Sequence, residues 1–271
     1  MKKYLNIISN NLRSIFSIKN LIFIIVSFIY VFSVKINNYD SNFSFNEILE
    51  VIFAGPINLD NISEIFTWTF YQAFLIYIIG NYIFNELSTR SIYVIPRLGN
   101  KQYWNICLQI TCFLACIIYF ALGTFIEFIF TAILNKGFNF SNIIDTLQIV
   151  VLLSLSSYYA ITVYIFNIMV TKSHIKSFLI LIVEFYVSIS IGNIFNIDKF
   201  IPLNQGILSK HIIYNFSYNW SFIFLGILIF IIVSFFIANK NILDYMHYET
   251  LMFALTHLFH RIKEEMQNEK R

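Results

Sequence analysis

Two glutamates fall inside long apolar stretches of the sequence, where a charged side chain is costly. Glu127 lies in the stretch 106–134 and Glu184 in the stretch 178–195. A carboxylate surrounded by hydrocarbon usually faces the interior of a helix bundle, pairs with another group or stays protonated. Both residues could therefore line a path for a substrate or hold helices together by hydrogen bonds. For Glu127 the alternative is a position near the end of a long helix, from which it reaches water.

A second group of chemically capable side chains lies near the C-terminus. His257 and His260 are three residues apart and Glu264 follows four residues later. At helical spacing the three share one face and could ligate a metal ion. The alternative is a solvated polar face opposite a row of leucines. Because a metal site needs further ligands that the sequence does not place, we expect no bound metal.

The remaining signatures of catalysis are absent from the sequence. Cys107, Cys112 and Cys116 fall in one apolar stretch, which predicts small buried side chains and no disulfide. There is no glycine-rich phosphate loop, no H-E-x-x-H and no G-x-S-x-G. No basic stripe stands apart from the apolar segments, so nucleic acid is not an expected partner. We expect neither a catalytic residue nor a cofactor of the chain's own.

The composition indicates which elements must position these residues. The chain is 58% apolar and 12% charged, whereas a soluble domain has about 25% charged residues. About 20 apolar residues are enough for a helix to cross a bilayer. The sequence therefore predicts an all-α, polytopic membrane protein with a single membrane domain over residues 1–238. The six expected transmembrane helices are Asn20–Ile36, Ile65–Phe84, Ile106–Leu134, Leu147–Val170, Phe178–Phe195 and Trp220–Ile237.

The distribution of lysine and arginine predicts the orientation. With the N-terminus in the cytoplasm, fourteen of the 18 basic residues fall on the inner side. Both termini are then cytoplasmic, in a multi-pass protein of the cell membrane. Residues 2–19 have apolar side chains at helical spacing, which predicts an amphipathic helix on the inner membrane surface. Residues 239–271 repeat this pattern and predict a cytoplasmic amphipathic tail.

The inner loop 85–104 is the most informative segment. It interleaves polar and charged residues with Ile, Val, Leu and Tyr, so its first part could form a short helix parallel to the membrane. Pro96 would bend the chain after that helix, and Trp104 would anchor the next span at the interface. The alternative is an ordinary loop with an excess of positive charge on the inner side.

This loop and the overall layout resemble the permease subunits of type-2 ABC exporters. The resemblance rests on Glu86 at the end of the second span, Arg90, the Arg97-Leu98-Gly99-Asn100-Lys101 sequence and Trp104. It extends to a surface helix before the first span and an apolar outer segment, 196–219, before the last one. The resemblance implies that Glu86, Arg90, Arg97 and Lys101 dock on a separate ATPase subunit, which would bind ATP and Mg²⁺. It also implies a second permease copy or a paralogue.

Two functions follow as expectations. The first is the membrane subunit of an ATP-driven exporter of a peptide or another amphipathic substrate, a role that peptide and bacteriocin export or immunity systems use. The second is a non-transporting immunity or sensor protein that binds a cationic peptide. The outer segment 37–64 carries five acidic residues, which would attract such a peptide electrostatically.

Overall fold

A computed structural model describes residues 2–35, 44–90, 93, 101–134 and 143–238, and these residues form helices and connecting turns with no strand among them. Six of the helices are long and apolar enough to cross a membrane, which confirms the predicted class and indicates a membrane-embedded protein. They are α2 (Ile18–Lys35), α4 (Ile62–Asn85), α6 (Lys101–Ile133), α7 (Ile143–Thr171), α8 (His174–Phe195) and α10 (Tyr218–Ala238).

Each of these helices overlaps the expected stretch and extends it at one or both ends. Local signals set several of the boundaries. Asn61 caps α4 by accepting a hydrogen bond from the backbone N–H of Glu64, and Ser173 caps α8 in the same way through Lys176. At its other end, α8 stops at Asn196, whose positive φ of 53° ends the helix. The 33 residues of α6 span about 50 Å, so this helix must tilt or project beyond a bilayer core.

The amphipathic N-terminal segment is shorter than expected. The helix α1 (Lys2–Ile15) ends before Phe16, and α2 begins at Ile18, so residues 2–19 do not form one helix. Ile15 is buried, and Leu12 and Phe16 pack against the hydrophobic core. Because α1 lies against α6 and α4, its apolar face covers the inner part of the bundle.

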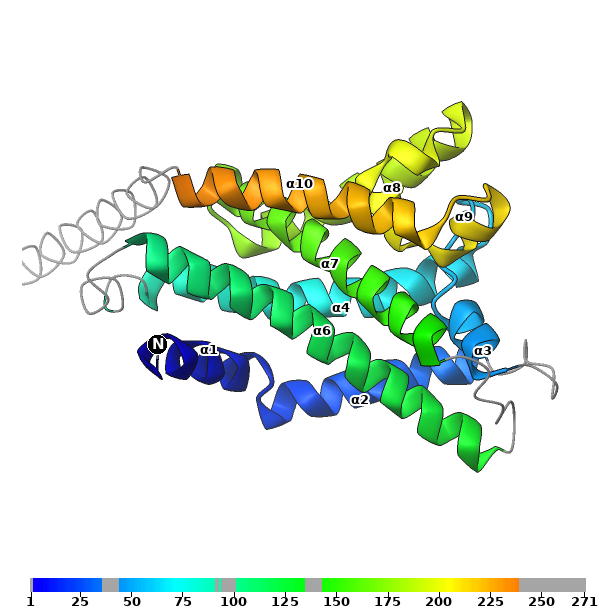
Figure 1. Cartoon of the computed structure of the whole chain (residues 1–271), viewed down its shortest axis with the longest axis horizontal. Coiled ribbons are helices and arrows are strands. Elements are labelled where there is room, and N and C mark those ends of the chain that lie inside the picture. Colours follow the sequence, from blue (N-terminus) through cyan, green and yellow to red (C-terminus); the bar gives the residue numbers. More distant parts are fainter. Residues whose placement is uncertain (1, 36–43, 91–92, 94–100, 135–142, 239–271) are drawn as a thin grey trace, which may run out of the picture.

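The helix α7 lies at the centre of the bundle, where it contacts α4, α6, α8 and α10 (Figure 1). In the most apolar 18-residue segment of α7, 72% of the residues are buried, against 17% in the corresponding segment of α10. The helix α10 therefore leaves most of its surface to lipid or to a partner. Polar side chains connect α7 to its neighbours. Ser157 donates to Gln72 of α4, and Tyr158 donates to Gln109 of α6, both at 2.9 Å. Such bonds hold helices together where little water competes.

Four short helices complete the end of the bundle opposite α1. The helix α3 (Phe45–Ile52) was not expected from the sequence. A capping box starts it, in which Ser44 and Glu47 each bond the other's backbone N–H. The segment between α8 and α10 forms η3 (Asp198–Phe200), η4 (Pro202–Gly206) and α9 (Leu208–Ile213). We call these three helices the cap.

Two ends of the molecule can be distinguished along its long axis (Figure 1). We name them after the predicted orientation. The inner end carries α1, the start of α6 and the π-helical turn η2 (Glu86–Arg90), which continues α4 directly. The outer end carries α3 and the cap. The amphipathic tail 239–271, with His257 and His260, lies outside the described residues.

Close packing of α6 on α2 gives a first prediction. A methyl group at Gly123 would lie 2.4 Å from the ring of Phe28, whereas one at Gly226 of α10 would meet nothing within 4 Å. Gly123→Ala should therefore overpack the bundle and cost about 1–3 kcal/mol. We expect a lower thermal unfolding temperature in detergent for Gly123→Ala. Gly226→Ala is the matched control and should leave that temperature unchanged or raise it. Equal effects of the two substitutions would contradict the packing.

Candidate functional site

The inner end contains the residues that the resemblance assigns to contact with an ATPase. Glu86 is the first residue of η2 and is only 3% exposed, so its carboxylate lies inside the protein. Lys101 starts α6 and is half-buried. Arg90 ends η2, and Arg97 lies outside the described residues. Of these residues the structure therefore places one buried acid, Glu86, and one half-buried base, Lys101.

Trp104 was expected to anchor α6 at the membrane interface. Its side chain is 2% exposed and belongs to the hydrophobic core. The large exposed ring at this position of α6 is that of Tyr103. Burial inside the bundle does not favour the anchoring role, which stays a prediction for Trp104.

The two intramembrane glutamates differ in their surroundings. Glu184 of α8 is half-buried and accepts a hydrogen bond of 3.1 Å from the amide of Asn167 in α7. It therefore links two helices. Glu127 of α6 is 0% exposed, so it does not reach water from the end of its helix. Neither of its carboxyl oxygens has a hydrogen-bond partner among the described residues.

The cap is built around a buried ion pair that the sequence analysis did not identify. The ammonium of Lys210 binds the carboxylate of Asp198, and both side chains are almost fully buried. Asn193 accepts a second hydrogen bond from Lys210, and the amide of Asn204 donates to Asp198 at 2.6 Å. Burial lowers the pKa of Lys210, whereas the hydrogen bond and charge of Asp198 favour the charged form.

A glutamine and a histidine complete this polar network. The amide of Gln205 donates to three backbone carbonyls of the cap, and its own carbonyl oxygen accepts from Ser221 of α10. The two ring nitrogens of His211 lie within hydrogen-bond distance of two backbone carbonyl oxygens. Nε2 is 2.9 Å from that of Gln205, and Nδ1 is 3.2 Å from that of Phe216. A neutral imidazole has one N–H, so both bonds together require the charged ring. Burial lowers the pKa of His211, and the two carbonyls act in the opposite direction.

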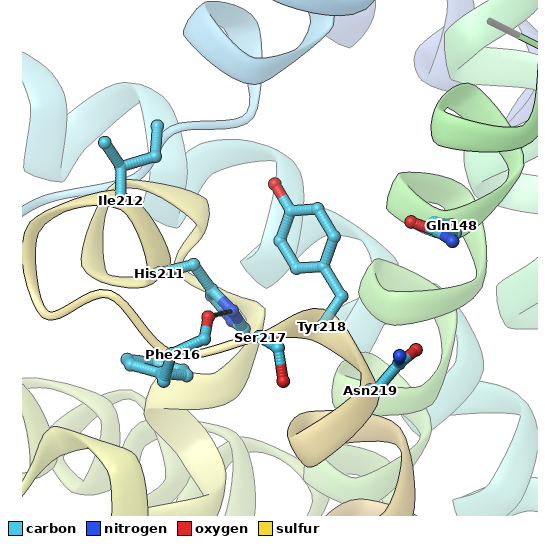
Figure 2. Close-up of a pocket in the computed structure, with 7 residues that line it drawn as sticks. All are labelled: Gln148, His211, Ile212, Phe216, Ser217, Tyr218 and Asn219. Carbon is cyan, nitrogen blue, oxygen red and sulfur yellow. Dashed lines mark hydrogen bonds between the residues drawn. The ribbon is translucent and has the colours of Figure 1, made fainter.

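An open pocket of about 330 Å³ lies beside this histidine (Figure 2). Rings and polar groups line it together, from α7, α9 and the start of α10. The lining residues are Gln148, His211, Ile212, Phe216, Ser217, Tyr218 and Asn219. Such a mixed wall suits an amphipathic ligand.

Carboxylates lie near one wall of this pocket. The hydroxyl of Tyr218 donates to Glu50 of α3 at 3.2 Å. Burial raises the pKa of Glu50, the hydrogen bond from Tyr218 opposes this, and the charges of Glu47 and Asp145 raise it again. The outer end therefore offers an aromatic and polar cavity with negative charge beside it. Within the described residues there is no cluster of three or more His, Cys, Asp or Glu that could hold a metal ion.

The buried ion pair of the cap gives a second prediction. Lys210→Met leaves the Asp198 carboxylate buried without its partner, which should cost about 3–5 kcal/mol of stability. Adding Asp198→Asn to the same protein should recover much of that loss. Unfolding temperatures in detergent would measure both effects. Lys199→Met is the matched control, because Lys199 is exposed and only lies over the Trp220 ring, a contact of about 0.5–1 kcal/mol. Equal losses at Lys199 and Lys210 would contradict the assignment.

Comparisons with known proteins leave the family of this chain open. No family model matches the chain, and no curated protein or solved structure shows significant similarity to it. The resemblance to type-2 ABC exporter permeases therefore rests on the chain's own arrangement of helices, loops and charges.

Proposed function

We propose that the chain is the membrane subunit of an ATP-driven exporter of the type-2 ABC kind. The observation that carries this proposal is the order of the elements. A short amphipathic helix precedes six apolar helices, the second of which runs directly into η2, and short helices fill the segment between the last two. This order is the one that the resemblance implies.

Coupling to an ATPase would take place at the inner loop. In the sequence, Arg90, Arg97 and Lys101 give this loop positive charge, which suits charge-assisted hydrogen bonds with acidic groups of an ATPase surface. The burial of Glu86 suggests that this residue holds η2 in place instead of contacting the partner. ATP and Mg²⁺ would bind to the ATPase, and nucleotide binding there would bias the membrane subunits toward one of two states.

A peptide or another amphipathic molecule is the proposed substrate class. The outer pocket combines the rings of Phe216 and Tyr218 with the polar side chains of Gln148 and Asn219. A second permease copy or a paralogue would complete the pathway. The exposed apolar surface of α10, which includes Ile223, offers room for such a partner or for lipid.

A non-transporting immunity or sensor protein is the second candidate function. The observation in its favour is the negative charge beside the outer pocket, where Glu47 and Asp145 act on Glu50. Carboxylates placed in this way attract a cationic peptide by their summed field. Such a protein would bind its peptide without any ATPase subunit.

Co-purification distinguishes the two functions and gives a third prediction. Tagged protein expressed with its neighbouring genes and purified in detergent should elute together with an ATPase subunit. The double substitution Arg90→Glu plus Arg97→Glu should reduce that ATPase by at least about tenfold, because two charge-assisted contacts become repulsive.

Lys176→Glu is the control for this experiment. It reverses one positive charge, half the charge change of the double substitution, at an exposed residue in the first turn of α8, which is predicted to lie on the same side of the membrane. The ATPase should still elute with this variant. A chain that elutes without any ATPase, together with loop variants indistinguishable from Lys176→Glu, would reject the exporter and favour the immunity or sensor protein.

A further inference from the structure

A second pocket, of about 250 Å³, lies at the inner end of the molecule, where the corner between α1 and α2 meets the end of α4. Its floor is formed by buried side chains, and its rim by exposed polar ones. The lining residues are Ser14, Ile15, Asn20, Ile78, Asn81, Tyr82, Asn85 and Thr89. Because six of these eight residues carry a hydroxyl or a carboxamide, the pocket is polar although it adjoins the most apolar part of the protein.

Several of these polar groups have unused bonding capacity. Asn20 donates to the carbonyl of Ile15, and Thr89 donates to the carbonyl of Asn85. The side chains of Ser14, Asn81 and Asn85 make no hydrogen bond within the described residues and are exposed. Hydroxyls and carboxamides both donate and accept, which suits a ligand that carries hydroxyl groups and acceptor oxygens.

The formal charges closest to this pocket in the sequence are mainly positive. Arg13 precedes Ser14 and Lys19 precedes Asn20, and both basic side chains are exposed. Arg90 follows Thr89 in the sequence. The one acidic neighbour in the sequence is Glu86, which follows Asn85; its side chain is buried and does not line the pocket. The surrounding charge therefore favours an anionic ligand.

An exposed apolar seam runs from this pocket toward the middle of the helices. Phe23 of α2 lies against Phe74 of α4 with ring centroids 6.1 Å apart, and Tyr30 lies against Phe70 at 5.2 Å. Phe23 is 49% exposed and Phe70 is 37% exposed, so a molecule outside the bundle can contact the seam. Asn20, Phe23 and Tyr30 follow helical spacing on α2. On α4 the corresponding row is Phe70, Phe74, Ile78, Asn81 and Asn85.

We propose that this pocket and seam bind an anionic phospholipid whose headgroup carries hydroxyls, as phosphatidylglycerol does. The phosphate would lie near Arg13 and Lys19, and the glycerol hydroxyls would bind the amides of Asn81 and Asn85. One acyl chain would lie along the aromatic seam. A polar pocket that continues into an apolar seam matches a lipid, because a soluble polyol phosphate would leave the seam empty. The proposal does not depend on the exporter function.

The lipid would also affect the inner loop. Asn85 ends α4 and η2 follows it directly, so a headgroup bound to Asn85, Arg13 and Lys19 holds the start of η2 relative to the corner between α1 and α2. An ordered lipid at this position would act on η2 equally in a transporter and in a sensor.

Native mass spectrometry and thermal unfolding of the full chain in detergent test this site. Phosphatidylglycerol should remain bound and raise the unfolding temperature, while phosphatidylcholine with the same acyl chains should bind at least about fivefold more weakly. Asn81→Leu and Asn85→Leu should each weaken phosphatidylglycerol binding by about fivefold, the factor expected for one lost hydrogen bond. Asn58→Leu, an exposed asparagine of the outer end, is the matched control and should bind the lipid like the wild type.

A second variant covers the case in which a leucine substitution disturbs folding. Arg13 and Lys19 are exposed, so Arg13→Gln plus Lys19→Gln should fold normally and lose the preference for phosphatidylglycerol over phosphatidylcholine. Equal binding of the two lipids by the wild type would overturn the proposal, as would pocket variants that behave like Asn58→Leu. Glycerol 3-phosphate alone should not stabilise the protein. If it stabilises as strongly as the lipid, the site binds a soluble phosphate and the lipid assignment fails.

Discussion

Polar side chains on these helices must find their partners inside the protein, because the bundle exposes mainly apolar surface. The central helix α7 meets this constraint on two sides at once, through Ser157 with Gln72 and Tyr158 with Gln109. Each helix bonds its own backbone, so these side chains fix how the helices rotate relative to one another. Loss of one partner would leave a donor or acceptor buried, a cost that lipid cannot offset by hydrogen bonding.

The cap follows from the same constraint. Its helices are three to six residues long, too short to bury a large apolar face, so polar contacts hold it. Asp198 and Lys210 neutralise each other's charge. The amide of Gln205 donates hydrogen bonds to backbone carbonyls that these short helices leave without partners. The absence of a side chain at Gly206 allows the cap backbone to pack closely against α7. A Cβ there would lie 2.2 Å from the hydroxyl oxygen of Ser156. One wall of the pocket beside His211 is consequently a hydrogen-bonded network.

The hydrophobic stretches could be predicted from sequence because they need only composition and length. The helix α3 could have been predicted as well, since Ser44 and Glu47 form a capping box and Phe45, Ile48, Leu49 and Ile52 follow at helical spacing. The ion pair of the cap could not, because the eleven residues between Asp198 and Lys210 carry no periodic pattern and only tertiary folding brings the two charges together. Burial of Trp104 and Glu127 likewise depends on how α6 rotates, which composition does not determine.

Several helices run from one end of the molecule to the other, and among them α7 and α8 contact the cap directly, whereas α4 reaches it through the segment that precedes it. At the outer end, the connection between α3 and α4 accepts two bonds from the cap, since Ser209 donates to the carbonyls of Ala54 and Gly55, shortly after the end of α3. Gly55 needs its positive φ of 72° there, and Trp68 packs closely over it. At its inner end, α4 passes without interruption into η2. Because a helix transmits displacement along its axis better than a loop does, α4 offers one route from η2 toward the cap, beside the direct contacts of α7 and α8 with η4. In the exporter proposed above, this route would connect η2 with the pocket beside His211.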